Sequence, residues 1–436
     1  MLEPVYRTAS FLCQLVARLP VGTTLGMAHL LWTLLSGQLL QSRGALFPAL
    51  SQAGLSAREA RQAEAALRGG RWKMQHLLTR LAWIIQRERR ATRVEIAALR
   101  PLLIDWVGFF RPRLTDCTSK HFDSRAGKAL PAIELGMVAI LEQVEGRCIP
   151  LLVDLNRTGD TVALLRLAKT KQGSQDVLVA DRQVKVSHLL EAGLQHFVVR
   201  AQQNLAARQS QPPVRAAGKR GRRPTRGRVV RPTDRQYRGK LLAATTADRT
   251  ETFAYHAYQG RQLRAKWFDQ IVVSGCPLVV SCLVVHDPRY KSPWVLLTDL
   301  VDASAETLFL LYRSRWGIEQ LPQTGKQILG GYRAFVHADE CRYRLPEVCL
   351  LCASLSLYLS ATCGAVATGF WDRHPRRTPG RFRRVLAGAP PPPFREFAVG
   401  SGRVREKRSV HGHLLTGIQG HRRQAKRLAT HQVTGK

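Results

Sequence analysis

Acidic side chains are scarce in this chain. It has 31 Asp and Glu residues against 67 Lys and Arg residues, and the formal net charge is +36 over 436 residues. Such an excess opposes folding through self-repulsion, so we expect a polyanionic partner, with nucleic acid as the leading candidate. A GC-rich genome would also raise the Arg content, but we do not expect that effect alone to give this charge.

Several sequence motifs are missing, and each absence argues against one class of protein. No G-x-x-x-x-G-K-[ST] loop occurs, so no nucleotide cofactor is expected. Cys349 and Cys352 form the only C-x-x-C pair among nine cysteines, which favours reduced thiols over a zinc site or a disulfide framework. No basic region followed by an apolar stretch and a cleavage site opens the chain, so we expect a cytoplasmic, nucleoid-associated protein without a signal peptide.

Two stretches without charged residues, Val21–Leu40 and Val348–Trp371, are long enough to cross a bilayer. Both contain several hydroxyl side chains, which favours buried core helices, so no membrane partner is expected. Hydrophobic residues make up 45% of the chain, as in globular proteins.

Residues 1–98 are predicted to form a helical domain. Ser56 and Glu59 have the spacing of a capping box, which marks the start of a helix after the turn at Gly54. Helix, glycine turn and helix is the outline of a helix-turn-helix, but an ordinary helical hairpin has the same pattern. The sequence leaves both interpretations open.

Residues 99–205 alternate between apolar runs and helical patterns. The order of strand, hairpin, helix and strand is typical of the opening of an RNase H-like fold. Residues 206–298 begin with a loop rich in Arg, Gly and Pro and continue with strand-like pieces. Residues 299–385 return to helical patterns, and residues 386–436 form a basic tail of low complexity.

Four polar side chains share one helical stripe near residue 319. Their spacing places them at about 0°, 300°, 340° and 320° around a helix that turns roughly 100° per residue. They are Tyr312, Arg315, Glu319 and Lys326. A carboxylate, two cations and a phenol on one face suit a metal ion beside a phosphate. Pro322 is predicted to kink this helix near Ile318.

The spacing Tyr-x2-Arg-x3-Glu-x6-Lys resembles the YREK signature of DDE transposases of insertion-sequence family four. The resemblance implies an α/β fold with an RNase H-like catalytic core, interrupted by a β-rich insertion and preceded by a helical N-terminal domain that grips the transposon end. It also implies that Glu319 is the third metal-binding carboxylate. Tyr312, Arg315 and Lys326 would then contact the DNA strand that is cut.

Two candidates exist for the first carboxylate. Asp105 follows the apolar run at 102–104, and DWVGFFRP resembles the Asp-x-Thr-Gly-Phe motif of the family, with Val107 where Thr is usual. Asp116, in LTDCTSK, has the Asp-x-Thr form but follows a poorer strand that contains Pro112. We prefer Asp105, because a first-strand acid should close a buried run.

The second carboxylate is predicted to be Asp181. An apolar strand ends in Asp-Arg, and a helix and a strand ending in Arg200 follow, which resembles the second motif of the family. Gln183 departs from the small residue usual there. The alternative is that Asp181 caps the next helix. Arg182, Arg200 and the arginines at 215–231 are candidates for contacts with the DNA backbone.

The resemblance thus implies a transposase that binds terminal inverted repeats as a homodimer, nicks them as an endonuclease and joins them to target DNA. Asp105, Asp181 and Glu319 would hold two Mg2+ or Mn2+ ions, which suit phosphodiester chemistry and prefer carboxylate oxygens. Val107, Gln183 and Pro322 depart from the pattern of the family and also fit a decayed or repurposed DNA-binding protein. A structure-specific RNase H-like nuclease would share the acids.

In relatives, a tryptophan of the insertion stacks on a flipped base. Trp267 and Trp294 are candidates for this role, but we favour core packing for both.

Overall fold

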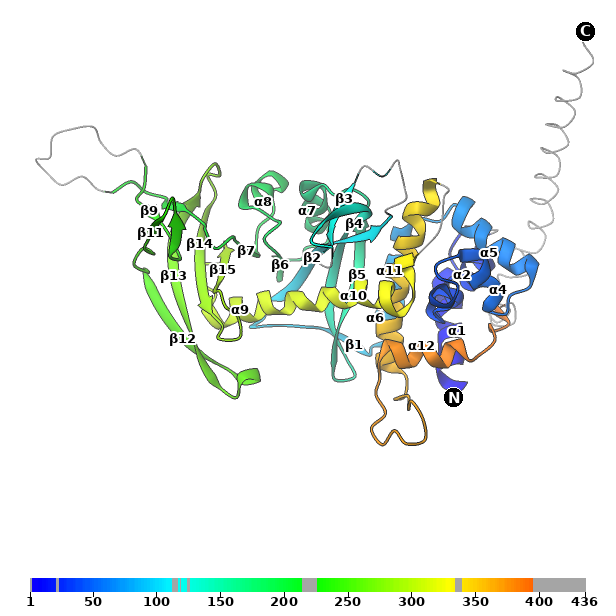
Figure 1. Ribbon diagram of the computed structural model, residues 1–436. Helices are drawn as coiled ribbons and strands as arrows, with labels where there is room; N and C mark the ends of the chain where they lie inside the picture. The colour runs from blue at the N-terminus through cyan, green and yellow to red at the C-terminus, as the bar shows by residue number, and fades with distance from the viewer. Residues whose placement is uncertain are drawn as a thin grey trace, which may run out of the picture. The chain divides into compact units, whose positions relative to one another are not determined.

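The computed structural model describes residues 2–20, 23–111, 117, 119–123, 126–213, 226–333 and 339–394. The chain forms two compact units (Figure 1). The first combines the residues up to Arg90 with those from Gln323 onward, and the second is Ala91–Pro322. The helices predicted at the N-terminus and those that follow the Tyr312–Glu319 segment therefore share one unit.

The first unit is helical. Its N-terminal helices are α1 (Leu2–Val16), α2 (Thr24–Leu35), α3 (Gln38–Gln41), α4 (Leu46–Gln52), α5 (Ala57–Gly69) and α6 (Met74–Glu88). Its later elements are a π-helical turn, η3 (Thr324–Ile328), a short 3-10 turn, η4 (Gly331–Arg333), α11 (Asp339–Thr362) and α12 (Pro379–Ala387). The predicted capping box is present, because the Ser56 hydroxyl accepts from the backbone N–H of Glu59 and Glu59 accepts from that of Ser56.

The two apolar stretches are core helices, as predicted. Within the described residues, α11 is the one helix that is long and apolar enough to cross a bilayer, and its most apolar window is entirely buried in the protein. The helix stops at Thr362, short of the predicted end at Trp371. Most of α2 is buried as well, and Gly26 lets it approach α5, because a Cβ there would meet the Gln62 carbonyl.

The second unit is built on a mixed sheet. Its first strands are β1 (Ala91–Arg93), β2 (Arg100–Phe110), β3 (Lys120–Asp123), β4 (Lys128–Val144), β5 (Arg147–Asn156), β6 (Asp176–Ala180) and β7 (Phe197–Arg200). β4 pairs antiparallel with β2 and β5, whereas β6 lies parallel to both β2 and β7. The β4–β5 turn falls at Glu145 and Gly146 as predicted, and both residues have positive φ.

The strands of residues 206–298 extend this same sheet. They are β8 (Ala207–Gln209), β9 (Val229–Val230), β12 (Arg249–Tyr255), β13 (Arg261–Val273), β14 (Val279–His286) and β15 (Trp294–Thr298), with β10 (Arg235–Tyr237) and β11 (Lys240–Leu242) as a separate pair. β15 joins them to the first strands by pairing antiparallel with β7. A 3-10 turn, η1 (His256–Tyr258), connects β12 to β13.

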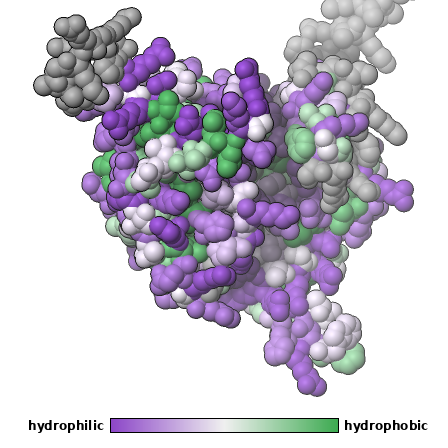
Figure 2. All heavy atoms as spheres, turned by 60° about the vertical axis from the view of Figure 1, so that its left-hand side comes forward, coloured by the Kyte–Doolittle hydropathy of each residue, from purple (hydrophilic) through white to green (hydrophobic). Residues whose placement is uncertain are grey.

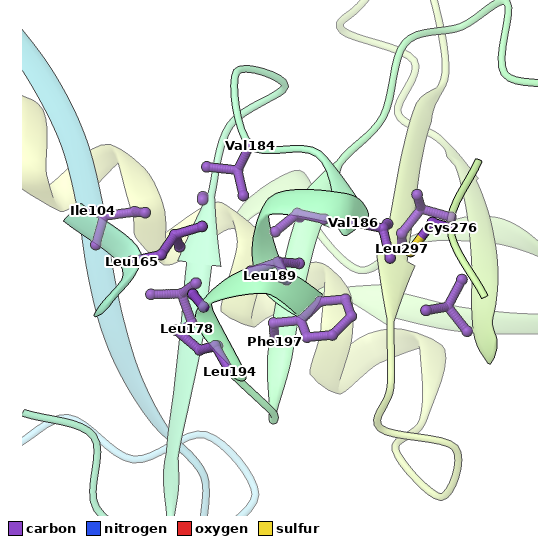
Figure 3. Close-up of a cluster of buried hydrophobic side chains, with 14 of the residues drawn as sticks. Ile104, Leu165, Leu178, Val184, Val186, Leu189, Leu194, Phe197, Cys276 and Leu297 are labelled. Carbon is purple, nitrogen blue, oxygen red and sulfur yellow. The ribbon is translucent and has the colours of Figure 1, made fainter. Parts of the chain in front are cut away.

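Helices cover the sheet on both faces (Figure 1). α7 (Thr161–Lys169) and α8 (Val186–Ala192) lie on one face, where Leu165, Leu189 and Phe197 meet in a buried cluster (Figure 3). α9 (Ala305–Ser314) lies on the other face. The surface drawn in Figure 2 is mostly hydrophilic, with hydrophobic residues scattered over it.

Candidate active site

Asp105 and Asp181 lie side by side in the sheet register. The parallel ladder between β2 and β6 runs from Arg100 opposite Asp176 to Leu103 opposite Val179, and the same offset carried two residues further sets Asp105 opposite Asp181. Asp181 directly follows the last residue of β6. Both side chains therefore belong to the face that carries α9, at the point where β6 stops.

The expectation that Asp105 closes a buried run was wrong. β2 continues to Phe110, because β4 pairs with it along this length and buries Trp106, Val107 and Phe109. The ladder to β6 is what ends near Asp105, and this opens one flank of β2. The alternative first acid, Asp116, lies outside the described residues.

The stretch from Tyr312 to Lys326 is not one regular α-helix. α9 ends at Ser314, a 3-10 turn (η2, Arg315–Glu319) follows, and α10 (Gln320–Gln323) leads to the π-helical η3. Pro322 has no N–H for the Ile318 carbonyl, so the distortion predicted near Ile318 is found. Tyr312, Arg315 and Glu319 belong to the second unit, whereas Lys326 lies in the first.

Gly317 sets how closely η2 approaches the sheet. A Cβ at this position would lie 2.6 Å from Cδ2 of Leu141 on β4, which is closer than side-chain atoms approach one another. The adjacent Ile318 is fully buried. On the preceding turn, the Tyr312 ring packs edge-on against the buried Trp294, with 5.1 Å between ring centroids. These contacts fix the position of Arg315 between them.

Arg315 is the centre of the site. Its side chain is only 8% exposed, and its two terminal nitrogens lie 3.5 Å from Asp105 Oδ2 and 2.9 Å from Glu319 Oε1. Burial alone would lower the pKa of Arg315, but the charges of Asp105, Tyr312, Asp181 and Glu319 outweigh it, and the pKa is raised. Two carboxylates, Asp105 and Glu319, thus pair with one buried cation, and the charge of a third, Asp181, also acts on it.

Tyr312 holds the second carboxylate. Its hydroxyl donates to Asp181 Oδ1 at 3.1 Å. Burial, and then the charge of Asp181, raise the pKa of Tyr312 to about 12, while Arg315 and Arg200 act in the opposite direction. The phenol therefore stays protonated at neutral pH and remains a hydrogen-bond donor.

The surroundings of Asp105 shift its pKa upward. Burial raises its pKa to about 6, although Arg315 and the backbone N–H of Trp106, which donates to Oδ1 at 2.9 Å, both favour the charged form. Glu319 and Asp181 add to the rise through repulsion. The three carboxylates therefore interact, and more positive charge than Arg315 supplies would favour their ionised forms.

The donor set suits a hard divalent cation, because it consists of carboxylate oxygens around a shared positive charge. In the arrangement seen here, that charge is the Arg315 guanidinium. No group of three His, Cys, Asp or Glu side chains in the described part of the chain is close enough to hold an ion. An ion bound by Asp105 and Glu319 would therefore compete with Arg315 for their oxygens.

The remaining predicted residues are placed as follows. Arg182 and Gln183 are exposed beyond β6, and Arg200 ends β7 near Tyr312. Asp181 does not cap the next helix, because α8 begins after Lys185. Among the arginines of 215–231, those at 215–225 lie outside the described residues.

The tryptophan predictions are confirmed, because Trp267 and Trp294 are both buried in the core.

Sequence reasoning missed Gly317 and the Trp106 backbone N–H. A glycine inside a helical pattern is itself a signal of close packing, so Gly317 was open to detection. The hydrogen bond from Trp106 had no signal, because it depends on the local backbone geometry of β2.

Residues 140–338 match the family model described as the transposase DDE domain. The match includes Asp181 and the whole Tyr312–Lys326 stretch, and it begins after Asp105. No curated protein matches the chain. The chain therefore carries a transposase DDE domain, the domain of a metal-dependent phosphoryl-transfer enzyme family.

Proposed function

We propose that this DDE transposase mobilises an insertion sequence of the family-four type, by binding its terminal inverted repeats, cleaving a strand and joining the freed end to target DNA. The observation that carries the proposal is the convergence of Asp105, Asp181 and Glu319 on Arg315. These acids are far apart in the chain, and a structural salt bridge would need only one of them.

The strand order supports an RNase H-like core. In the order β5, β4, β2, β6 and β7, the first three strands form an antiparallel meander and the last two lie parallel to β2. Acids on β2 and directly after β6 then stand beside each other at the ends of parallel strands, where α/β sheets bind ligands. The later strands are the β-rich insertion of this proposal.

In this proposal, Asp105, Asp181 and Glu319 hold two Mg2+ or Mn2+ ions, as DDE transposases generally use divalent metals. Two such ions would activate the attacking oxygen and stabilise the leaving oxygen of a phosphodiester. Arg315 would then be free to make a two-pronged contact with a phosphate, and Tyr312 orients Asp181.

Several cations are assigned to the DNA strands. Lys326, Arg182 and Arg200 would neutralise backbone phosphates, which carry affinity rather than sequence choice. We assign binding of the repeat to the helical first unit. It could act through the α4–α5 hairpin or through the cluster of Arg18, Arg80 and Arg87 around the half-exposed Trp83, where Arg80 lies 3.9 Å from the ring centroid. Arginine and an exposed indole suit backbone and base contacts.

We further propose that two copies pair the two ends of the element, in the cytoplasm and on the nucleoid. The DNA that flanks the gene supplies the test substrate, because inverted repeats that bracket the gene would be the element ends. The protein should cleave a labelled duplex of that repeat in Mg2+ or Mn2+, and should bind it better than a duplex with scrambled ends.

Substitutions of the three carboxylates test whether cleavage depends on them. Asp105→Asn, Asp181→Asn and Glu319→Gln should each abolish cleavage and leave repeat binding intact. Asp302→Asn, which changes an exposed acid of the same unit outside the cluster, should cleave like the wild type. Equal cleavage of scrambled ends would point to a structure-specific nuclease instead. Cleavage that survives all three substitutions would refute the assignment.

A further inference from the structure

The segment between α11 and α12 is a closed loop. Backbone bridging pairs Val366 with Arg376, and the Arg381 side chain donates to the Val366 carbonyl at 2.8 Å. Figure 1 draws this segment, in orange, as a loop that projects away from α11 and α12. We refer to residues 366–376 as the projecting loop. Its base is fixed, so its tip is presented in a defined position.

Two aromatic side chains occupy the tip of the projecting loop. Phe370 is 99% exposed and Trp371 is 67% exposed, and their rings meet edge to face with 5.2 Å between centroids. Gly369 makes room for this arrangement, because a Cβ there would lie 2.5 Å from the Trp371 ring. A fully exposed phenylalanine in ring contact with an exposed tryptophan is unusual on a surface that is mostly hydrophilic, and it indicates a binding role.

Asp372 holds the tip in shape. One carboxylate oxygen, Oδ2, accepts from the backbone N–H and the hydroxyl of Thr368, both at 3.0 Å, and pairs with Arg381 at 2.7 Å. The other oxygen, Oδ1, accepts from the backbone N–H of His374 at 3.2 Å. These hydrogen bonds lower the pKa of Asp372, so the carboxylate is charged at neutral pH. The loop therefore presents its aromatic side chains at a reduced cost in conformational entropy.

The charges of the loop identify the partner. Asp372 is its only acid and is occupied by the contacts just described. Arg373, His374 and Arg376 are exposed around the aromatic pair. A second copy of this chain would bring the same positive loop and a net charge of +36. A polyanion whose interior offers flat apolar surfaces fits both features, and stacked DNA bases between phosphates have that chemistry.

We propose that the projecting loop is a DNA wedge, in which Phe370 and Trp371 enter a base step and unstack it while Arg373 and Arg376 contact the flanking phosphates. The proposal takes from the proposed function only that DNA is the substrate. The loop lies in the helical unit, so the wedge would bend or open DNA that this unit holds, and it adds a base-contacting element separate from the carboxylate site.

The test compares ring-deleted and ring-retaining variants of the full-length protein. The probes are a fluorescein-labelled duplex of mixed sequence and the same duplex with 2-aminopurine at a TA step, a step that unstacks readily. Wild-type binding should raise 2-aminopurine emission. Phe370→Ser with Trp371→Ser should lose that rise and bind at least ~5-fold more weakly. Phe370→Tyr with Trp371→Phe should retain both.

Two controls separate the rings from surface hydrophobicity and from charge. Phe122→Ser removes an exposed phenylalanine of β3 in the other unit and should behave like the wild type. Arg373→Ala with Arg376→Ala should keep the 2-aminopurine rise at saturation. It should also lower the slope of log K against log salt by about 2, as expected for two lost phosphate contacts.

Three results would overturn the wedge. Unchanged affinity and emission in the ring-deleted protein would do so, provided that its thermal unfolding matches the wild type. A sedimentation change from dimer to monomer in that variant, with DNA binding intact, would assign the loop to a second copy. Failure of the wild type to bind any DNA would defeat both this inference and the proposed function, whereas DNA binding without dependence on the rings defeats the wedge alone.

Discussion

Arg315 is a buried arginine and Arg80 is a half-buried one, and the charges that surround them are of opposite sign. Arg315 lies among carboxylates, which raise its pKa despite burial. Burial lowers the pKa of Arg80, and the neighbouring Arg18 and Arg87 lower it further. In the described part of the chain, no acid pairs with these three arginines, and one terminal nitrogen of Arg80 has no hydrogen-bond partner. Although acids are scarce in this chain, three of them lie near Arg315, whereas the arginines around Trp83 are not neutralised.

The difference separates two uses of positive charge. Around Arg315, the carboxylates outnumber the one guanidinium, so its positive charge is neutralised within the protein and an added cation must compete with Arg315 for the carboxylate oxygens. Around Trp83, the arginines repel one another, so phosphates that bind there would relieve this repulsion. The net charge of the chain therefore says little about where DNA binds, whereas the location of the acids says more.

The largest effect on stability should come from removing Arg315, and removing Arg80 gives the comparison. Arg315→Met leaves the half-buried Asp105 without its cation and should lower the free energy of unfolding by about 3 kcal/mol. Protonation of Asp105, whose pKa is already about 6, limits the loss. Arg80→Met should change stability by less than ~1 kcal/mol, because lost packing and relieved repulsion offset each other. Urea unfolding at pH 7 measures both.

Arg315→Lys is the matched control, since it keeps the charge and loses the two-pronged geometry, and it should lie between the wild type and Arg315→Met. Mn2+ should raise the melting temperature of Arg315→Met more than that of the wild type, because the competing guanidinium is gone. Equal losses for Arg80→Met and Arg315→Met would show that the two settings do not differ in energy.

A smaller effect is expected at Gly317, which tests whether the paired setting depends on close packing. Gly317→Ala should push η2 away from Leu141, lower stability by about 1–3 kcal/mol and reduce cleavage by the displaced Arg315 and Glu319. Gly69→Ala, at the end of α5 where a Cβ meets nothing, should be neutral or slightly stabilising. Unfolding and cleavage assays on the same preparations give both values.

Leu141→Ala provides the internal check. It removes the clashing atoms, so the double variant should recover part of what Gly317→Ala loses, and the two substitutions should be non-additive. Strict additivity would mean that the contact between Gly317 and Leu141 does not position the turn.

The sequence predicted local features better than it predicted connections. The β4–β5 turn, the capping box of Ser56 and the strand before Asp181 follow from neighbouring residues, and all three are found. The pairing of β15 with β7, which merges the later strands with the first ones, depends on residues about a hundred positions apart. No local pattern encodes it.

In the candidate site as well, the sequence predicted local groupings better than contacts between distant residues. Tyr312, Arg315 and Glu319 could be grouped from spacing, because about two turns of helix keep them on one face even when η2 tightens. The ion pair between Arg315 and Asp105 could not be predicted, since it depends on the end of the β2–β6 ladder and on the approach that Gly317 permits. Asp105 was chosen for a reason that proved wrong, because β2 does not end there.

The smallest effect should come from Glu142, a buried acid whose neighbouring cations have other partners. Burial raises its pKa to about 7, and Arg93 and Arg100 offset this only in part because they pair with Asp176 and Glu95. A raised folded-state pKa favours folding below the unfolded value of 4.5, and that contribution is lost as the pH rises through about 7. Glu142→Gln should therefore match the wild type at pH 4 and exceed its stability at pH 8 by about 1 kcal/mol, after discounting for partial solvent screening. Urea unfolding across this range measures the difference. A gain that is equally large at pH 4 would assign it to packing rather than charge, and Glu142 would no longer mark an intermediate case between the neutralised Arg315 and the unneutralised arginines around Trp83.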